Sequence, residues 1–463
     1  MSRSLTLPTL SLGLLMRVAP TPRRKGSPMS THVSKTERNT APSRRDRTVA
    51  RRTVALLFAA WLVDYIDRLV IVLALPAIEK DFGLNKTEGG LILTAFFIAY
   101  AVCQVPGGLL ADRFGAKKTM LAALTLWSIF TGLTGLAVSF GMLLVIRVLF
   151  GITEGVFPGA SMKSISERTL PRQRMTANGL MLASNPLGSA LAPLIAAPVL
   201  IAFGWKETFW AVAGLGLLMA IVMWRALPGP LGSEANATAA STPEETAGPS
   251  APAIRTVDLL RHSMLYRFAL LFVGFDLVSW GLVSWAPSYL IQARGVNIAH
   301  TAVYTAIPWL AATVSTVLGG LLFDRFFVGR HRWLVIPSMV ATGIFLVFMI
   351  NAQTAAQFVL FETLGMICMW LSFMPIFGLP LRMLPASVAG LAGGLVNFGG
   401  QFAGALAPFI MGWLTDTYSF TAAFTFLLLG VVIAIGASLW TPQRPEVFAK
   451  AFGLEPVEQP TAR

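Results

Sequence analysis

The segment Gly107-Gly108-Leu109-Leu110-Ala111-Asp112-Arg113-Phe114 ends one long apolar stretch, and a near copy, Gly319-Gly320-Leu321-Leu322-Phe323-Asp324-Arg325-Phe326, ends another. Both copies place a glycine pair four and five residues before an acid that is followed by an arginine. A fainter repeat links Ser189-Ala190-Leu191-Ala192-Pro193 with Gly404-Ala405-Leu406-Ala407-Pro408. Internal repeats of this kind are typical of membrane proteins that are built from two related bundles. The sequence therefore predicts two equivalent halves.

The composition is that of a membrane protein. Of 463 residues, 55% are hydrophobic and 13% are charged, whereas soluble domains have about 25% charged residues. The apolar runs are too long and too little alternating for barrel strands of about ten residues. Cys103 and Cys368 lie in apolar runs, and the four histidines lie in tails, loops or span ends. We expect an all-α membrane protein with no disulfide, metal or other cofactor.

Twelve apolar stretches are each long enough to cross a hydrocarbon layer of about 30 Å. They are residues 54–79, 88–112, 118–140, 141–166, 175–203, 206–227, 264–293, 299–325, 331–351, 357–381, 387–416 and 419–441. We therefore predict twelve transmembrane helices in two pseudo-symmetric six-helix bundles. The expected parts are a disordered basic cytoplasmic tail (1–53), an N-terminal bundle (54–227), a cytoplasmic linker (228–258), a C-terminal bundle (259–441) and a cytoplasmic tail (442–463).

The positive charge has a simple distribution. Residues 1–53 hold twelve Lys and Arg against Glu37 and Asp46, which is most of the chain's net charge of +14. Such an arm beside a membrane span favours contact with anionic headgroups over nucleic-acid binding. Most other Lys and Arg residues fall in the loops that are cytoplasmic if both termini are inside. The outer loops hold Lys80, Lys86, Lys206 and Arg294.

Ionisable residues inside the spans are candidates for function, because each costs about 2.5–3.5 kcal/mol to insert into the membrane. They are Asp64, Asp67, Arg68, Arg147, Glu154, Asp276 and Glu362. Arg147 and Glu154 are two helical turns apart and share a face, and Asp64 and Arg68 have the spacing of a direct pair. The alternative is that these groups are structural ion pairs between helices. Glu362 is close to the start of its span, so we expect it to be interfacial.

Arg68 and Arg147 together predict an anionic substrate. A guanidinium binds a carboxylate through two parallel hydrogen bonds and stays charged at any working pH. An anion that neutralises the arginines would leave a nearby carboxyl, Asp67 or Glu154, free to take up a proton. The sequence thus indicates coupled movement of a small organic anion and protons, with no chemical conversion.

The motif Gly108-x3-Asp112-Arg113-x-Gly115-x-Lys117-Lys118 resembles the signature loop of the major facilitator superfamily, and Asp324-Arg325 belong to its second copy. Asp112 is expected to accept hydrogen bonds from the N-terminus of a neighbouring helix, in a contact that breaks when the halves move. The simpler alternative is a basic turn that only sets membrane orientation.

Further motifs narrow this resemblance to the anion:cation symporter family. They are Asp67-Arg68, Arg147-x3-Gly151-x2-Glu154-Gly155, Trp285-x-Pro287-x-Tyr289-Leu290 and Gly394-x2-Asn397-x-Gly399-Gly400. Similar members include bacterial carriers of galactonate, glucarate, hexuronates, tartrate and phthalate. The resemblance covers residues 54–441 and implies proton-driven uptake across the bacterial inner membrane by a monomer. It also implies substrate binding by Arg68 and Arg147, proton handling by Asp67 and Glu154, and Asn397 in the opposite wall.

This chain departs from the family pattern in two acids. Asp64 stands where the family often has a neutral Asn, and Asp276 is an additional carboxyl. Asp64 is a further candidate for proton coupling, and the extra acids could change the proton count or favour a partly cationic substrate. Weaker candidates for substrate binding are Tyr65, Trp280, Trp285 and Gln401, since such residues more often serve packing between helices.

Two other functions remain open. An anion exchanger or a drug/proton antiporter would share the superfamily fold, although a drug exporter would favour an apolar cavity without the two arginines. A membrane enzyme, sensor or receptor would require a soluble catalytic or signalling domain, a phosphate-binding glycine loop or a metal site, which the sequence does not contain.

Overall fold

A computed structural model describes residues 43–231, 263–327, 329–383 and 386–443, and these residues contain helices and no strand. The first half comprises α1 (Arg44–Phe82), α2 (Lys86–Phe114), α3 (Ala116–Thr134), α4 (Phe140–Gly155), α5 (Phe157–Arg168), α6 (Pro171–Leu182), α7 (Ser184–Ala202) and α8 (Trp205–Ala226). The second comprises α11 (Ser263–Gln292), α12 (Ile298–Leu322), the π-helical η3 (Phe323–Phe327), α13 (Arg332–Ile350), α14 (Ala355–Leu371), α15 (Phe373–Met383), α16 (Ala386–Thr417) and α17 (Phe420–Trp440). Most of the predicted tails and linker lies outside the described residues. The prediction of a disordered tail is wrong for residues 44–53, which are helical because α1 extends beyond its apolar stretch and begins at Arg44.

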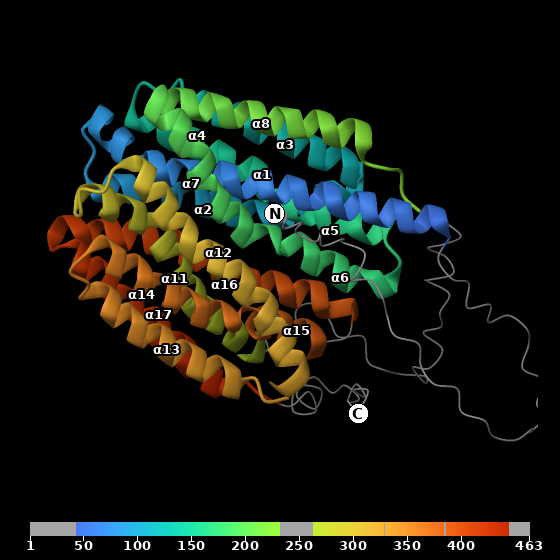
Figure 1. The fold of residues 1–463 in the computed structure, drawn as a ribbon. Coiled ribbons are helices and arrows are strands. Elements are labelled where there is room, and N and C mark those ends of the chain that lie inside the picture. Colours follow the sequence, from blue (N-terminus) through green and yellow to red (C-terminus); the bar gives the residue numbers. More distant parts are fainter. Residues whose placement is uncertain (1–42, 232–262, 328, 384–385, 444–463) are drawn as a thin grey trace, which may run out of the picture. The chain divides into compact units, whose positions relative to one another are not determined.

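These elements form twelve rods, because α4 continues into α5, α6 into α7, α12 into η3, and α14 into α15 (Figure 1). By length and composition, ten of the rods are apolar enough to cross a membrane. The remaining two are α1, which contains three ionisable residues in its apolar stretch, and α3, which begins with two lysines. The predicted all-α architecture of two six-helix bundles is confirmed. Helix α3 is shorter than its predicted span, since it ends at Thr134.

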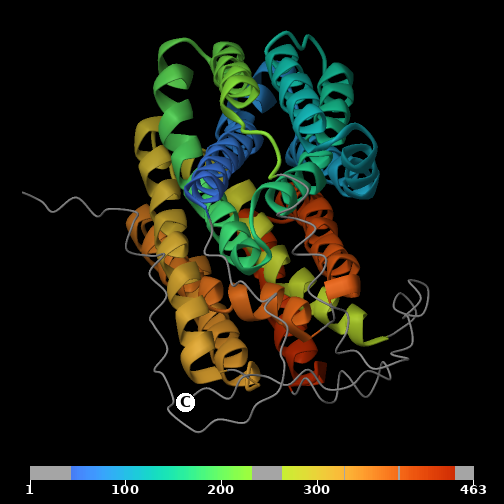
Figure 2. The same ribbon diagram turned by 90° about the vertical axis from the view of Figure 1, so that its right-hand side faces the viewer.

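The two halves repeat the same packing order. In the first half, α1 packs against α7, α2 against α4, and α3 against α8. In the second half, α11 packs against α16, α12 against α14, and α13 against α17. In each half, the first span therefore packs against the fifth, the second against the fourth, and the third against the sixth. The halves, coloured blue to green and yellow to red in Figure 2, are therefore pseudo-symmetric copies.

Glycines of the two repeated segments allow the second span of each half to approach a break in the fourth. A Cβ on Gly107 would lie 2.5 Å from the Cα of Val156, the residue between α4 and α5. A Cβ on Gly319 would lie 2.8 Å from the Cα of Leu371, next to the break between α14 and α15. The repeat in the sequence thus encodes an equivalent close contact in both halves.

The halves meet mainly through α2 with α16 and α7 with α12, and α1 also contacts α11. We call the end where α2 begins and α16 ends the far end, and the end from which the linker leaves the linker end. At the far end, the Asp416 carboxylate of α16 accepts hydrogen bonds from the backbone N–H groups of Lys86 (3.0 Å) and Thr87 (2.7 Å). It also accepts one from the Thr87 hydroxyl (2.6 Å). The side chain of Gln292 on α11 donates to Glu79 on α1 at 2.9 Å. Polar contacts therefore join the halves at the far end.

Candidate functional site

Arg68 lies at the centre of a buried ionic cluster in the first half. Its guanidinium is 3.1 Å from the Asp64 carboxylate one turn earlier and 3.2 Å from Glu154 at the end of α4. The predicted pairing of Asp64 with Arg68 is confirmed. Tyr65 and Tyr100 place their rings 4.8 and 4.6 Å from the guanidinium carbon, which adds cation–π attraction in a dry setting. One cation is thus shared by two carboxylates within the same half.

Arg147 has a different environment. Its guanidinium donates to the Thr134 hydroxyl at 2.7 Å and lies 4.6 Å from the centre of the Phe150 ring. Its side chain is 1% exposed and its Nε has no hydrogen-bond partner. No carboxylate of the described residues lies within 4.0 Å of it. Asp67 is instead bonded to the Thr131 hydroxyl at 2.7 Å.

A cavity with about 320 Å³ of empty space lies between the halves, and both Arg68 and Arg147 line it. Its wall is formed by Arg68, Leu69, Ile71 and Val72 of α1, Leu93, Phe96 and Phe97 of α2, Arg147 of α4, and Trp280, Val283 and Ser284 of α11. The Phe97 and Trp280 rings meet edge to face across the boundary, 4.5 Å between centroids. Two fixed cations in an otherwise largely apolar wall can hold a small anion by charge and hydrogen bonds.

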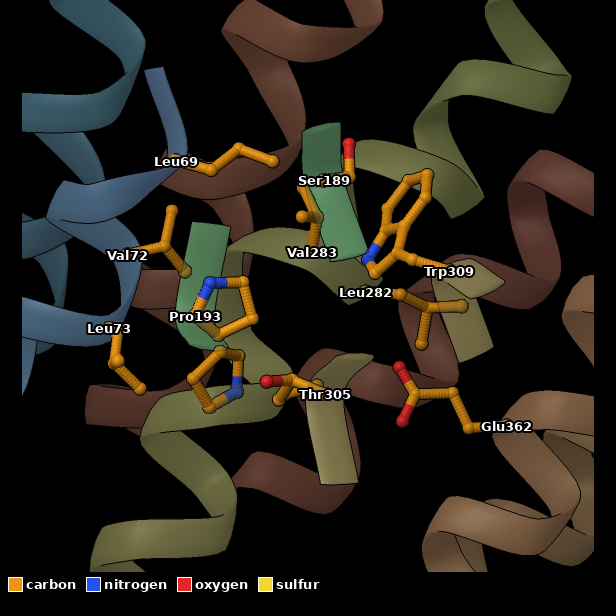
Figure 3. Close-up of a pocket in the computed structure, with 12 residues that line it drawn as sticks. Leu69, Val72, Leu73, Ser189, Pro193, Leu282, Val283, Thr305, Trp309 and Glu362 are labelled. Carbon is orange, nitrogen blue, oxygen red and sulfur yellow. The ribbon is translucent and has the colours of Figure 1, made fainter. Parts of the chain in front are cut away.

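A neighbouring cavity of about 370 Å³ shares Leu69, Val72 and Val283 with the first. Figure 3 shows its lining, in which Glu362 points its carboxylate toward Thr305. Glu362 is 4% exposed, and its Oε2 has no hydrogen-bond partner. Glu362 therefore faces the interior of the protein beside a cavity, whereas its depth in the membrane stays a prediction. Its distance from the helix start could be read from the sequence, but not the face that α14 turns toward the cavity.

The other predicted binding residues are distributed differently. Tyr65 contacts Arg68, and the Asn397 amide donates to Gln104 on α2 at 3.0 Å, across the boundary between the halves. Gln401 is buried, and its Oε1 has no partner. Trp285 is fully buried and donates to the Pro408 carbonyl at 3.0 Å, so it packs α11 against α16 and lines neither cavity.

Two weaker candidates lie at the boundary between the halves. Trp280 lines the arginine cavity. Asp276, which the sequence marks as an additional acid, is buried beside Gly400 of α16. The described residues contain no group of three His, Cys, Asp or Glu side chains that could hold a metal ion.

The signature-loop residues lie at the linker end of α2 and α3. Asp112 is 73% exposed in its side chain and pairs with Lys163 of α5 at 2.9 Å. This contact replaces the expected one with a helix N-terminus, because a lysine is within reach of the carboxylate. Lys117 donates to the Leu227 carbonyl beyond α8 at 3.2 Å, and Gly115 adopts a positive φ of 86°.

The remaining residues of the two copies are solvent-facing or peripheral. The Arg113 and Arg325 guanidiniums each lie 5.4 Å from the ring of the following phenylalanine, Phe114 and Phe326. Lys118 is exposed, and Gly108 has open space on its Cβ side. Asp324 lies in the π-helical turn η3, where the second copy leaves regular helical geometry.

Twelve helical rods in two pseudo-symmetric bundles, ten of them apolar enough to cross a membrane, with a charged cavity between the bundles, form the architecture of a membrane transporter. The family model described as Major Facilitator Superfamily matches residues 56–408, so the chain belongs to this superfamily. Its relatives are transporters, and the chain is a transporter and not an enzyme.

Several curated relatives align over nearly their whole length. The hexuronate transporter of Bacillus subtilis is 28% identical over 83% of this chain and 92% of that protein. The probable sulfoacetate transporter of Cupriavidus necator is 30% identical, with 81% and 90% covered. The probable L-galactonate transporter of Escherichia coli is 26% identical, with 85% and 89% covered.

Solved structures support the same fold. A bacterial homolog of the human lysosomal transporter Spinster superposes with a TM-score of 0.68 at 18% identity, covering 86% of this chain and 97% of that one. A D-xylose-proton symporter superposes with a TM-score of 0.70 at 14% identity, covering 85% and 98%.

Proposed function

We propose that this transporter takes up a small organic anion, a sugar acid or similar carboxylate, together with protons. The observation that carries the proposal is Arg147: a buried guanidinium beside a cavity with no carboxylate of the described residues within 4.0 Å. A buried guanidinium without a directly paired carboxylate is costly. A carboxylate in the cavity would supply this direct partner with two acceptor oxygens.

The cluster around Arg68 supplies a means of coupling. Its guanidinium is paired with both Asp64 and Glu154. A substrate carboxylate that attracts Arg68 would weaken these two pairs, and a released carboxyl in an apolar wall favours the neutral, protonated form. Anion and proton would then be bound together. Glu154 and Asp67 are the proposed proton carriers, with Asp64 as an additional one.

Three kinds of relatives support an anionic substrate, since their names specify hexuronate, sulfoacetate and L-galactonate. All three are small organic acids. The charge distribution in the loops favours a cytoplasmic linker end with both termini inside. We therefore assign the far end, where Asp416 caps α2, to the outer face of a bacterial inner membrane. Because polar contacts join the halves at the far end, we infer that this end is closed, as in an inward-facing or occluded state, and we propose that the carrier is a monomer.

The test uses the purified chain in vesicles loaded with buffer at neutral pH. Uptake of labelled D-glucuronate is measured with an outside pH one unit lower, with equal pH, and with a protonophore added. Accumulation that requires the pH gradient and disappears with the protonophore supports symport. Uptake that depends on internal anion and ignores the gradient would assign an exchanger instead. No uptake of glucuronate, galactonate or sulfoacetate would contradict the proposed substrate class.

A further inference from the structure

The second cavity contains an acidic wall that the arginine site does not use. Glu362 of α14 is almost fully buried, lines this cavity, and has an unpartnered oxygen. No Lys, Arg or His among the described residues pairs with it within 4.0 Å. A carboxyl that is buried next to a cavity without a partner requires either a proton or a ligand that donates hydrogen bonds.

The polar neighbours of Glu362 also offer acceptors. The Ser189 hydroxyl of α7 donates to the Asn185 carbonyl at 3.0 Å, and the Thr305 hydroxyl of α12 donates to the Thr301 carbonyl at 2.8 Å. Because each hydroxyl donates its proton to a carbonyl of its own helix, its oxygen is left as an acceptor toward the cavity. The indole of Trp309 is the one side-chain donor in the lining apart from these hydroxyls. This wall therefore suits groups that mainly donate.

The two cavities have opposite chemical character and share part of their lining. Arg68 and Arg147 line one of them, and Glu362 lines the other. Leu69, Val72 and Val283 belong to both, so a ligand of several carbon atoms can contact both. The arginines come from the first half and Glu362 from the second. A ligand that reaches both sites therefore contacts both halves.

We propose that Glu362 binds the hydroxyl groups at the end of the substrate that is remote from its carboxylate, and thereby selects polyhydroxylated monocarboxylates over dicarboxylates. This inference rests on the proposed function, since it assumes that the arginines hold the carboxylate. Hydroxyls donate to Glu362 and can accept from Trp309. A second carboxylate would meet the acceptor oxygens of Glu362, Ser189 and Thr305 without a cation to balance its charge.

The experiment compares two six-carbon acids that differ at one end. D-gluconate has one carboxylate and a terminal hydroxyl, whereas D-glucarate has a carboxylate at each end. Their KM values are measured in vesicles with the wild-type chain and with Glu362→Gln, which keeps the size and replaces one acceptor oxygen by a donor group. The wild type should prefer gluconate at least tenfold. In the variant, KM for gluconate should rise and KM for glucarate should fall, which changes their ratio at least tenfold.

Opposite shifts for the two acids distinguish recognition from general damage to the fold. The control is Glu207→Gln on α8, which lines neither cavity and should leave the ratio unchanged. An unchanged ratio in Glu362→Gln, or equal increases of both KM values, would overturn the proposal. So would unchanged KM values with loss of accumulation driven by the pH gradient, since Glu362 would then carry a proton.

Two further results separate this proposal from the proposed function. If Glu362→Gln does not reach the membrane, Glu362→Asp replaces it, because the shorter acid should keep the preference for gluconate with higher KM values for both. Loss of that preference would count against the subsite. If the wild type transports gluconate without discriminating against glucarate, the subsite proposal fails while the proposed function stands. If it transports no organic anion, both fail.

Discussion

The two buried arginines have different neighbours, and this difference separates their expected roles. Arg68 is balanced by Asp64 and Glu154, whereas Arg147 has a threonine hydroxyl and an aromatic ring. Removing a partner from a balanced buried pair leaves a charge that the fold must accommodate. Removing a guanidinium that has no directly paired carboxylate mainly removes its attraction for an anion. Arg147 is therefore the cleaner position at which to test substrate binding.

We expect Arg147→Lys to lose most uptake of D-glucuronate. A lysine retains the charge but cannot form the planar pair of hydrogen bonds to a carboxylate. Truncating one member of a buried hydrogen-bonded charge pair costs about 2–5 kcal/mol, which corresponds to roughly thirtyfold or more in apparent affinity. Initial uptake rates over a range of concentrations measure the loss. Arg225→Lys, at the exposed end of α8, is the matched control, and equal activity of both variants would remove Arg147 from the site.

Glu154→Gln should separate substrate movement from proton movement. The amide keeps a hydrogen bond to Arg68 but cannot gain or lose a proton, so accumulation driven by a pH gradient should be abolished while exchange of labelled for unlabelled substrate continues. Both reactions are measured in the same vesicles. Accumulation at the wild-type level would exclude Glu154 as a proton carrier and leave Asp67 and Asp64.

These residues could be identified from the sequence, because ionisable side chains are rare in the spans and their spacing is regular. Their hydrogen-bond partners could not. The four-residue interval in α1 predicts the contact of Asp64 with Arg68, because helix geometry alone brings them together. The threonine hydroxyls that hold Asp67 and Arg147 come from α3, and no interval in the sequence specifies which face of α3 meets α1 and α4. The burial of Glu362 beside a cavity and of Trp285 against α16 could not be predicted for the same reason, because the direction that a side chain faces depends on helix rotation.

At the level of elements, the breaks in the fourth and tenth spans are matched to glycines on neighbouring helices. Val156 interrupts α4 and α5 beside Gly107, and Leu371 lies at the equivalent place beside Gly319. Hydropathy predicts each of these spans as one continuous helix, since a break changes hydrogen bonding and not apolarity. The number and order of spans could therefore be predicted from the sequence, whereas the breaks within them could not.

We expect Gly107→Val to destabilise the protein by about 1–3 kcal/mol, the usual cost of forcing atoms into a packed interface. The Cβ of the new valine would lie 2.5 Å from the Val156 Cα. Because both contacting groups are close to the backbone, the clash can be relieved only if α2 moves away from α4. Thermal unfolding of the detergent-solubilised chain measures the effect. The adjacent substitution Gly108→Val is the control, because open space surrounds its Cβ. Equal loss of stability in both variants would show that helix propensity, not packing, is responsible.

At the level of the whole molecule, the halves meet through two equivalent helix pairs, and polar contacts at the far end hold one arrangement of these pairs. Asp416 accepts hydrogen bonds from the first two N–H groups of α2, in addition to the N-cap that Asn85 of the same half provides. Helix N-termini attract carboxylates. The far end therefore closes by a contact that costs little to break and remake, as movement of the halves requires.

The pair of substitutions Thr87→Cys and Asp416→Cys, in a chain whose native cysteines are replaced by serine, should form a disulfide on mild oxidation. The cross-link should stop uptake, because the far end can no longer open, and a reducing agent should restore it. Uptake of glucuronate before oxidation, after oxidation and after reduction is the measurement. Thr87→Cys alone is the control. Full activity of the cross-linked chain would show that the far end need not open during transport.

The placement of the Arg68 cluster within a single half also bears on the empty carrier. Asp64, Arg68 and Glu154 all belong to α1 and α4. When the halves rotate without bound substrate, these opposite charges move together as one rigid group. No ion pair of this cluster has to break across the interface between the halves. We therefore expect the carrier without substrate to change readily from its inward-facing to its outward-facing state. This property permits net accumulation of the substrate rather than obligatory exchange.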